Sequence, residues 1–225
     1  MPTKLYSSLP IIPRLLSFSC AFLVWAGFTN ANPVVYKAGA PSQDKKLVFV
    51  ASDHEYRAEE TIPALARILT VHHGFDCTVL FGVDQKGEIQ AGISNIPGLE
   101  ALKKADGMVI FTRFLALPPE QMKHIDDYLN RAGPVLGLRT STHGFNYKND
   151  KDPYYKYHFR YSGKEYEAGF GHQVLGQSWV GHYGRNHTQS TRISIIPKQK
   201  DNPILRGVKE IHVQAGGYNA EAQKD

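Results

Sequence analysis

The residues best suited to chemistry lie in loops that directly follow apolar segments. In "GPVLGLRTSTHGF", residues 133–145, an apolar run breaks into a polar turn of the kind that holds the nucleophile in several hydrolase folds. Such a turn needs small residues on both sides of the nucleophile, whereas Ser141 lies between Thr140 and Thr142. The flanks therefore argue against a serine hydrolase.

Histidine is the second candidate group. His54 and His143 follow apolar runs, and His182 and His187 lie in a later aromatic segment. Their spacing fits no standard zinc motif, and no complete phosphate-binding glycine motif is present, so no cofactor is predicted. The alternatives left open are backbone hydrogen bonding by each histidine and a divalent metal site. The ligands of that metal would come from His54, His143, His182, Glu55 and Glu59.

A third group is the charged stretch "SDHEYRAEE" at 52–60. Glu60 precedes a helical pattern, where a negative charge is explained by the helix N-terminus alone. Asp53, His54 and Arg57 come directly after an apolar run, and ionisable side chains crowded at a strand end favour a site role. We therefore predict these three as site residues.

The segment after residue 145 is long, irregular and rich in tyrosine. Aromatic faces bind the apolar faces of sugars while neighbouring polar groups meet the hydroxyls, but the same rings can simply pack a long loop onto the fold. Packing is the expected role for most of them. Tyr183, in "GHYGRNH", is the aromatic residue that we predict for ligand contact.

The elements that must position these residues follow an alternating pattern. Short apolar runs are predicted as strands at 46–52, 76–82, 107–112 and 134–138. One amphipathic helix is predicted where Ile62, Leu65, Ala66 and Leu69 recur at helical spacing, and a second from Pro118 onward. This alternation predicts an α/β fold with a doubly wound, mostly parallel sheet in three layers. In such a sheet the ligand site lies beyond the carboxyl ends of the strands, which places the loops after residues 52, 112 and 138 together.

Composition bounds the class of protein. Residues 1–31 combine two basic residues with an apolar run of about 14, which predicts a secretory signal peptide and no membrane anchor after cleavage. Without that segment the 26 basic residues fall to 24 against 21 acidic ones, a charge too mild to indicate nucleic acid. Residues 32–45 are predicted as a linker, and Cys77 as a core residue.

The stretches "VFVASDHEYRAEETIPALARIL", "LPPEQMKHIDDYLNRAGPVLGLRTSTHGF", "VGHYGRNH" and "NPILRGV" resemble the ThuA-like (trehalose-utilisation) family, in its exported planctomycete-type branch. The resemblance spans about residues 46–218 and implies the flavodoxin-like fold of class I glutamine amidotransferases. It also implies a role in carbohydrate use. Similar proteins continue with one or two further strands, so we expect residues 46–225 to form a C-terminally truncated version of that domain.

In class I amidotransferases the nucleophilic cysteine directly follows the strand that corresponds to "PVLGL". This chain has Arg139 there, and the H-x-E pair of that family is missing near its C-terminus. A guanidinium cannot replace a thiolate, so glutaminase chemistry is excluded by residue identity.

We therefore expect an exported or periplasmic protein with a small carbohydrate as its partner and an undetermined oligomeric state. One hypothesis is a sugar-active hydrolase or lyase, in which Arg139 stabilises an oxyanion while His54 or His143 moves a proton. The other is a non-catalytic carbohydrate-binding or scaffold protein. The predicted binding residues are Asp53, Arg57, Thr140, His182, Tyr183 and His187.

Overall fold

The computed structural model describes residues 33–222, and the predicted signal peptide at 1–31 lies outside these described residues. The centre of the fold is a five-stranded sheet in the order β1-β3-β2-β4-β5. The strands are β1 (Val34–Tyr36), β2 (Lys46–Ser52), β3 (Asp76–Phe81), β4 (Gly107–Thr112) and β5 (Val135–Gly137). All neighbouring pairs are parallel except β1 with β3, so the predicted α/β fold with a mostly parallel sheet is confirmed.

The N-terminal edge of this sheet corrects one prediction. The segment 32–45 was expected to be a linker, but Val34–Tyr36 pairs antiparallel with β3 as strand β1. A strand of three residues is too short to show the alternation of apolar and polar side chains that marks a longer strand. The prolines and polar residues of the surrounding segment suggest a loop. Its strand conformation depends on a pairing partner about 40 residues further along the chain.

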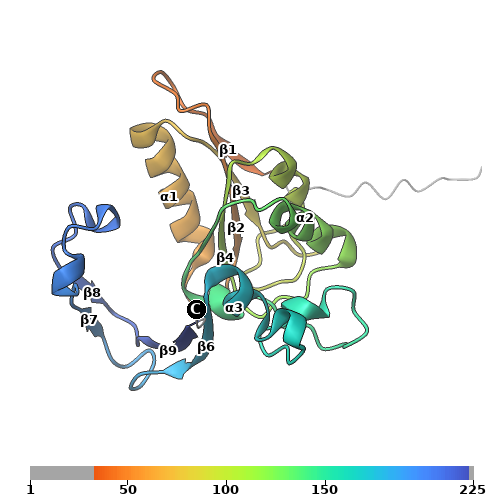
Figure 1. Cartoon of the computed structure of the whole chain (residues 1–225). Coiled ribbons are helices and arrows are strands. Elements are labelled where there is room, and N and C mark those ends of the chain that lie inside the picture. Colours follow the sequence, from red (N-terminus) through yellow and green to blue (C-terminus); the bar gives the residue numbers. More distant parts are fainter. Residues whose placement is uncertain (1–32, 223–225) are drawn as a thin grey trace, which may run out of the picture.

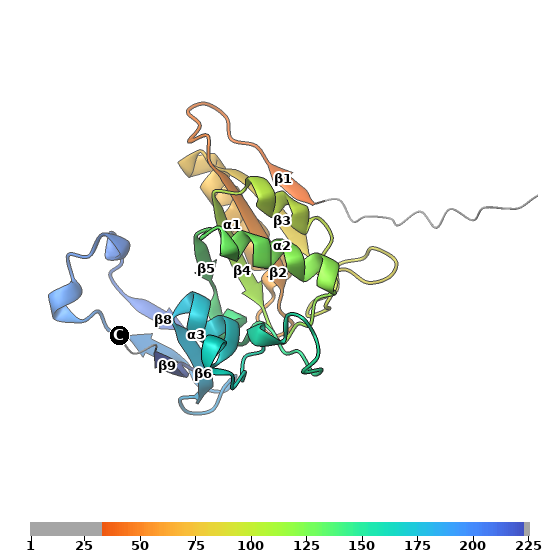
Figure 2. The same cartoon turned by 45° about the vertical axis from the view of Figure 1, so that its right-hand side comes forward.

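Helices cover both faces of the sheet (Figure 1). Successive residues of a strand point to opposite faces, so Phe49 and Ala51 of β2 enter one core cluster while Val48 and Val50 enter the other. Helix α1 (Ala58–His73) packs on the first face, and the 3₁₀ helix η1 (Leu99–Lys104) and helix α2 (Pro119–Asn130) cover the second. The turned view in Figure 2 shows α2 on the opposite side of the sheet from α1.

Helix α1 is bounded by local signals. Its buried residues are Ala58, Ile62, Ala66 and Thr70, at a spacing of four that keeps them on one face of the helix. At its C-terminus Gly74 adopts φ +72°; its N–H donates to the carbonyl of Thr70, and the Phe75 N–H donates to that of Leu69. A side chain at residue 74 would meet a backbone carbonyl only 2.7 Å away, so glycine is required there.

The long aromatic segment is mostly packed, as predicted for most of its rings. Tyr147, Tyr157 and Phe170 are buried in the α2-side core, and helix α3 (Gly169–Leu175) lies over β5. Cys77 is buried in the α1-side core, as predicted.

The remaining strands lie outside the main sheet. β6 (Gln177–His182) pairs with β9 (Tyr218–Ala222), and β7 (Thr191–Ile193) pairs with β8 (Ile211–Val213). Strands β7 and β8 have only three residues each. They form a separate two-stranded arm that extends below α1 in Figure 1.

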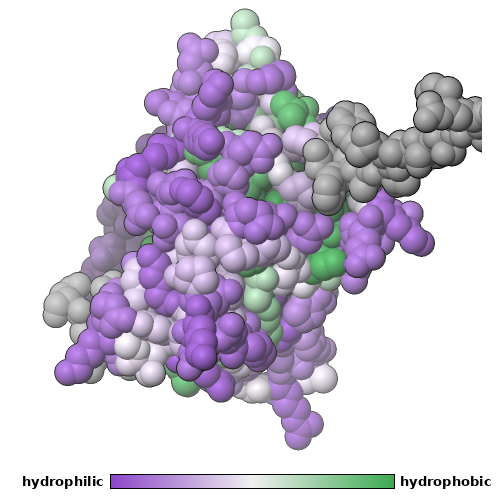
Figure 3. All heavy atoms as spheres, turned by 90° about the vertical axis from the view of Figure 1, so that its right-hand side faces the viewer, coloured by the Kyte–Doolittle hydropathy of each residue, from purple (hydrophilic) through white to green (hydrophobic). Residues whose placement is uncertain are grey.

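The surface seen from the right-hand side of Figure 1 is mainly hydrophilic, with apolar residues confined to small patches (Figure 3). Among the helices of residues 33–222, none combines the length and apolar character needed to cross a membrane.

The core assignment can be tested by deleting the same atoms at a buried and at an exposed position. Ile125 of α2 is fully buried and Ile204 is 86% exposed. We expect Ile125→Ala to lower the free energy of unfolding by about 2–5 kcal/mol, because it leaves a cavity as well as removing buried apolar surface. Ile204→Ala should change it by less than about 0.5 kcal/mol. Urea denaturation measures both, and equal effects would contradict the described packing.

Candidate functional site

Three loops meet at the carboxyl ends of the parallel strands, as predicted from the strand order. β2 leads through α1 to β3 on one side, whereas β4 leads through α2 to β5 on the other, so the chain diverges between β2 and β4. The loop after β2 is joined to the loop after β4 by an ion pair of Glu55 with Arg113. It is joined to the turn after β5 by a hydrogen bond from Thr140 to Asp53.

Arg139 occupies a strained turn directly after β5. Its φ is +47°, in the left-handed region that non-glycine residues seldom adopt, and the 3₁₀ helix η2 (Arg139–His143) begins there. The strained strand-to-helix geometry of a nucleophile elbow is therefore present, with an arginine at its apex. Strain of this kind persists only where the surroundings over-determine the conformation, and it concentrates at functional sites.

The Arg139 guanidinium is held between two tyrosine rings. Its carbon lies 4.6 Å from the Tyr56 ring centre and 3.9 Å from that of Tyr218. One terminal nitrogen donates to the Tyr56 hydroxyl at 2.9 Å and to the Gly216 carbonyl at 2.8 Å. Its Nε is buried and has no hydrogen-bond partner among the described residues. Arg139 is therefore rigidly oriented and retains an unused donor.

Glu55, in the same loop as Tyr56, forms ion pairs with residues of two other loops. One carboxylate oxygen lies 2.7 Å from Nε of Arg113, and the other lies 2.8 Å from Nε2 of His187 and accepts from Asn186 at 3.0 Å. Burial works to raise the pKa of Glu55, but the Arg113 guanidinium and the contact with His187 outweigh it and lower that pKa below its usual value. Glu55 is therefore an ionised anchor for the loop that carries Asn186 and His187.

Asp53 and Thr140, both predicted to bind substrate, are fully buried. Asp53 accepts from the backbone N–H groups of Glu55 and Tyr56 at 2.8 and 2.5 Å and from the Thr140 hydroxyl at 2.6 Å. Their polar atoms are thus already bonded to protein, so these two residues hold loops together rather than face a ligand. The local reason is that a carboxylate after a strand readily closes a turn on the N–H groups that follow it.

Ser141 is equally internal. Its hydroxyl donates to the carbonyls of Ile110 and Leu138, and it accepts from the N–H of Thr112. The Ser141 hydroxyl thus links β4 to the end of β5 by hydrogen bonds, which agrees with the prediction that Ser141 is not a nucleophile.

His143, predicted as a proton carrier, is only 2% exposed. Its ring lies 4.6 Å from that of Trp179, 4.9 Å from that of Phe114 and 5.7 Å from that of Tyr218, measured between centres. Burial, reinforced by the Arg113 guanidinium, lowers the pKa of His143 to about 3, so the imidazole is neutral at pH 7. The structure therefore gives His143 a packing position in place of the predicted access to substrate.

His182 lies next to this aromatic cluster, 5.6 Å from Trp179 and 5.1 Å from Tyr218 between ring centres. Burial lowers its pKa, and the positive charge of Arg139 acts in the same direction. Its Nε2, the Trp179 Nε1 and the Tyr218 hydroxyl are buried without hydrogen-bond partners among the described residues. Buried polar atoms without partners are uncommon, and several together mark a place where a polar ligand or water belongs.

The other predicted residues are placed as follows. His54 is exposed and its Nε2 lies 2.5 Å from a terminal nitrogen of Arg113, which brings it into the Glu55 network. Arg57 is exposed, adopts φ +53° before α1 and pairs with Glu60, so it acts at the helix start and not in this cluster. Tyr183 is 66% exposed, and only its backbone, which bonds Gly217, is fixed here.

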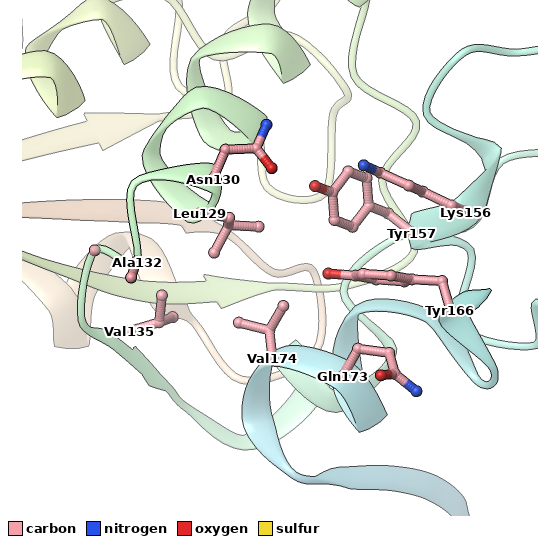
Figure 4. Close-up of a pocket in the computed structure, with 10 residues that line it drawn as sticks. Leu129, Asn130, Ala132, Val135, Lys156, Tyr157, Tyr166, Gln173 and Val174 are labelled. Carbon is pink, nitrogen blue, oxygen red and sulfur yellow. The ribbon is translucent and has the colours of Figure 1, made fainter.

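A groove of about 490 Å³ reaches Arg139 and Tyr56 from the α1 side of the sheet. A second cavity, of about 390 Å³, lies between α2 and α3, near the start of β5 and so at the opposite end of that strand from Arg139 (Figure 4). Lys156, at the rim of the second cavity, already pairs with Asp126. The groove at Arg139 is lined by a residue that has a strained backbone and a buried Nε without a hydrogen-bond partner among the described residues. We therefore take this groove as the candidate site.

Sequence reasoning considered Glu55 only as a metal ligand, and it missed Tyr56, Arg113 and Tyr218, which complete the cluster. Glu55, Tyr56 and Arg113 lie in the loops after residues 52 and 112 that were predicted to meet, so their position was available although their roles were not. Tyr218 carries no sequence signal, because it approaches Arg139 only through the fold.

Within residues 33–222, no three side chains of His, Cys, Asp or Glu are arranged to hold a metal ion. Comparisons of the chain with protein-family models, with curated proteins and with solved structures found no match in any of the three.

The structural role of Thr140 predicts a loss of stability on Thr140→Val. The substitution keeps the shape but leaves a buried carboxylate oxygen without its donor, which should cost about 1–3 kcal/mol in the free energy of unfolding. Thr78→Val is the matched control, since the Thr78 hydroxyl has no hydrogen bond among the described residues and lies in a strand. Denaturant unfolding of both variants provides the measurement, and equal stabilities would contradict a structural role.

The lowered pKa of Glu55 predicts a pH-dependent contribution to stability. Since the folded-state pKa lies below the ordinary value of 4.5, the ionised carboxylate adds stability above that value and loses it as pH falls through the folded-state pKa. Glu55→Gln should therefore be less stable than the parent at pH 7, and the difference should shrink below about pH 4.

Thermal unfolding between pH 3 and pH 7 provides the measurement for Glu55→Gln. Glu60→Gln is the control, because Glu60 belongs only to an exposed pair with Arg57. A constant difference between Glu55→Gln and the parent across this pH range would rule out the Glu55 assignment.

Proposed function

We propose that this protein is exported and binds a carbohydrate or sugar derivative at the carboxyl end of its sheet, with Arg139 as the principal donor and without glutaminase activity. The observation that carries this proposal is the state of Arg139. It is strained and clamped between Tyr56 and Tyr218, its buried Nε has no hydrogen-bond partner among residues 33–222, and the residue lines a groove.

The chemistry of an arginine held in this way supports recognition of an oxygen-rich ligand. Arginine stays charged at every relevant pH and donates in a fixed plane, so it binds carboxylate, carbonyl and hydroxyl oxygens. Tyr56, which carries the Arg139 guanidinium over its ring and stacks with His187, also lines the groove, so an aromatic residue lies at the site. The resemblance to the ThuA-like family is the ground for proposing a carbohydrate as the ligand, and the predicted signal peptide is the ground for proposing export.

A second candidate is catalysis on the same ligand, favoured by His182. Its Nε2 is buried and without a partner among the described residues, and its lowered pKa leaves the ring neutral and able to accept a proton at pH 7. In this version Arg139 stabilises the negative charge that develops on the substrate oxygen. His182 replaces His143 as the proposed proton acceptor, because His143 is enclosed by aromatic rings.

The test is a thermal-shift screen of the purified protein against a library of sugars, glycosides and sugar acids. A ligand that binds the folded state raises the melting temperature by mass action. Arg139→Lys should weaken binding of each hit by at least about tenfold, since hydrogen bonds to a charged group are worth about 1.5–3 kcal/mol. Arg57→Ala, at an arginine outside the cluster, should leave binding unchanged.

Melting of both variants without ligand separates loss of fold from loss of binding. If no sugar shifts the parent, or if Arg139→Lys binds every hit as the parent does, the binding proposal fails. Product analysis by NMR then separates the two candidates, since turnover that His182→Gln removes without loss of affinity supports catalysis, and binding without turnover supports a binding protein.

A further inference from the structure

The groove that reaches Arg139 has an unusual distribution of polarity. Its volume of about 490 Å³ falls within the range of small-molecule sites. Arg139 and the ring of Tyr56 lie at its polar end, and most of the remaining lining is apolar. A ligand small enough to contact only Arg139 would leave this apolar surface open to water.

The apolar walls come from three separate parts of the fold. Helix α1 contributes Ile62 and Leu65, the ends of β4 and β5 contribute Phe111 and Leu138, and the arm contributes Val213. Figure 1 shows the arm of β7 and β8 extending past the end of α1 that lies near the sheet's carboxyl edge. One wall of the groove is therefore supplied by the arm.

The arm is anchored through the candidate site itself. Gly216 accepts a hydrogen bond from Arg139 and Tyr218 stacks on its guanidinium; Gly216 lies in the short connection after β8, and Tyr218 begins β9. Arg139 thus belongs at once to the polar cluster and to the groove. This continuity implies that one ligand can occupy both.

Packing alone does not account for the groove, because its walls are incompletely covered. Val213 is 38% exposed, and Leu65 and Leu138 are only partly buried, although all three are large apolar side chains. Apolar surface left open next to a clamped cation matches an occupant with an apolar body and an oxygen-bearing head.

We propose that the groove binds an aryl or alkyl group joined to the oxygen-rich head that Arg139 holds, so that the ligand is an aryl or alkyl glycoside or glycoside-like conjugate rather than a free sugar. This inference rests on the proposed function for its sugar head. The apolar body would lie between Leu65 of α1 and Val213 of β8. Removing part of a phenyl group from water strengthens binding by roughly tenfold.

The experiment measures the affinity of the full chain for three probes by calorimetry. These probes are methyl glucoside, phenyl glucoside, and phenyl phosphate as an apolar anion without sugar. We expect phenyl glucoside to bind about tenfold more tightly than methyl glucoside. Val213→Asp, which places a charge on the groove wall, should remove that preference.

Two further variants keep the result interpretable. Ile193→Asp makes the same kind of change at an exposed residue of the neighbouring strand that does not line the groove, and it should keep the phenyl preference. Leu65→Gln alters the opposite wall and should reduce the preference even if Val213→Asp disturbs the arm. Circular dichroism establishes that each variant is folded.

The outcomes distinguish this inference from the proposed function. Equal affinities for phenyl and methyl glucoside, unchanged in both groove variants, would overturn the groove inference while leaving sugar binding intact. Binding of phenyl phosphate alone, lost in Val213→Asp, would support the apolar groove and overturn the sugar head. If none of the three probes binds, both proposals are overturned for these ligands.

Discussion

The hydrogen bond from Thr140 to Asp53 is the interaction on which the geometry of the site depends. It is buried, and it joins the loop after β2 to the turn after β5, two strands that are separated in the sheet by β4. A buried carboxylate without donors would be costly, so Asp53 also accepts from two backbone N–H groups of its own loop. Those bonds set the position of Glu55 and Tyr56, and through them the position of Arg139.

Ion pairs of Glu55 and cation–π contacts of Arg139 connect the rest of the cluster to this hydrogen bond. Glu55 draws in Arg113 from the β4 loop and His187 from the segment after β6. Tyr56 and Tyr218 enclose the guanidinium of Arg139 from segments about 160 residues apart. The arrangement explains how a non-glycine residue stays at positive φ, because the rings and the Gly216 carbonyl hold its side chain in place.

The same arrangement explains why an arginine at the apex of this turn is suited to binding. A guanidinium cannot attack a carbonyl carbon, but held rigidly it needs little reorganisation to meet an oxygen. Near it lie the His182 Nε2 and the Tyr218 hydroxyl, which are buried without hydrogen-bond partners in the described part of the chain, and it also lines the mainly apolar groove. The position of Arg139 between them is the observation that supports the amphipathic ligand proposed for the groove.

By itself the sequence determined the α/β class, the four parallel strands and their helices, the buried role of Cys77, and the meeting of three loops at one edge of the sheet. These features follow from local periodicity and from the rule that parallel strands end at the same edge, both of which can be read from neighbouring residues. Only the tertiary structure decided that β1 is a strand, that Asp53, Thr140 and His143 are interior, and that Tyr218 and Val213 belong to the site. Each of those outcomes depends on contacts between segments far apart in the chain, where burial and pairing override what a side chain's chemical type suggests.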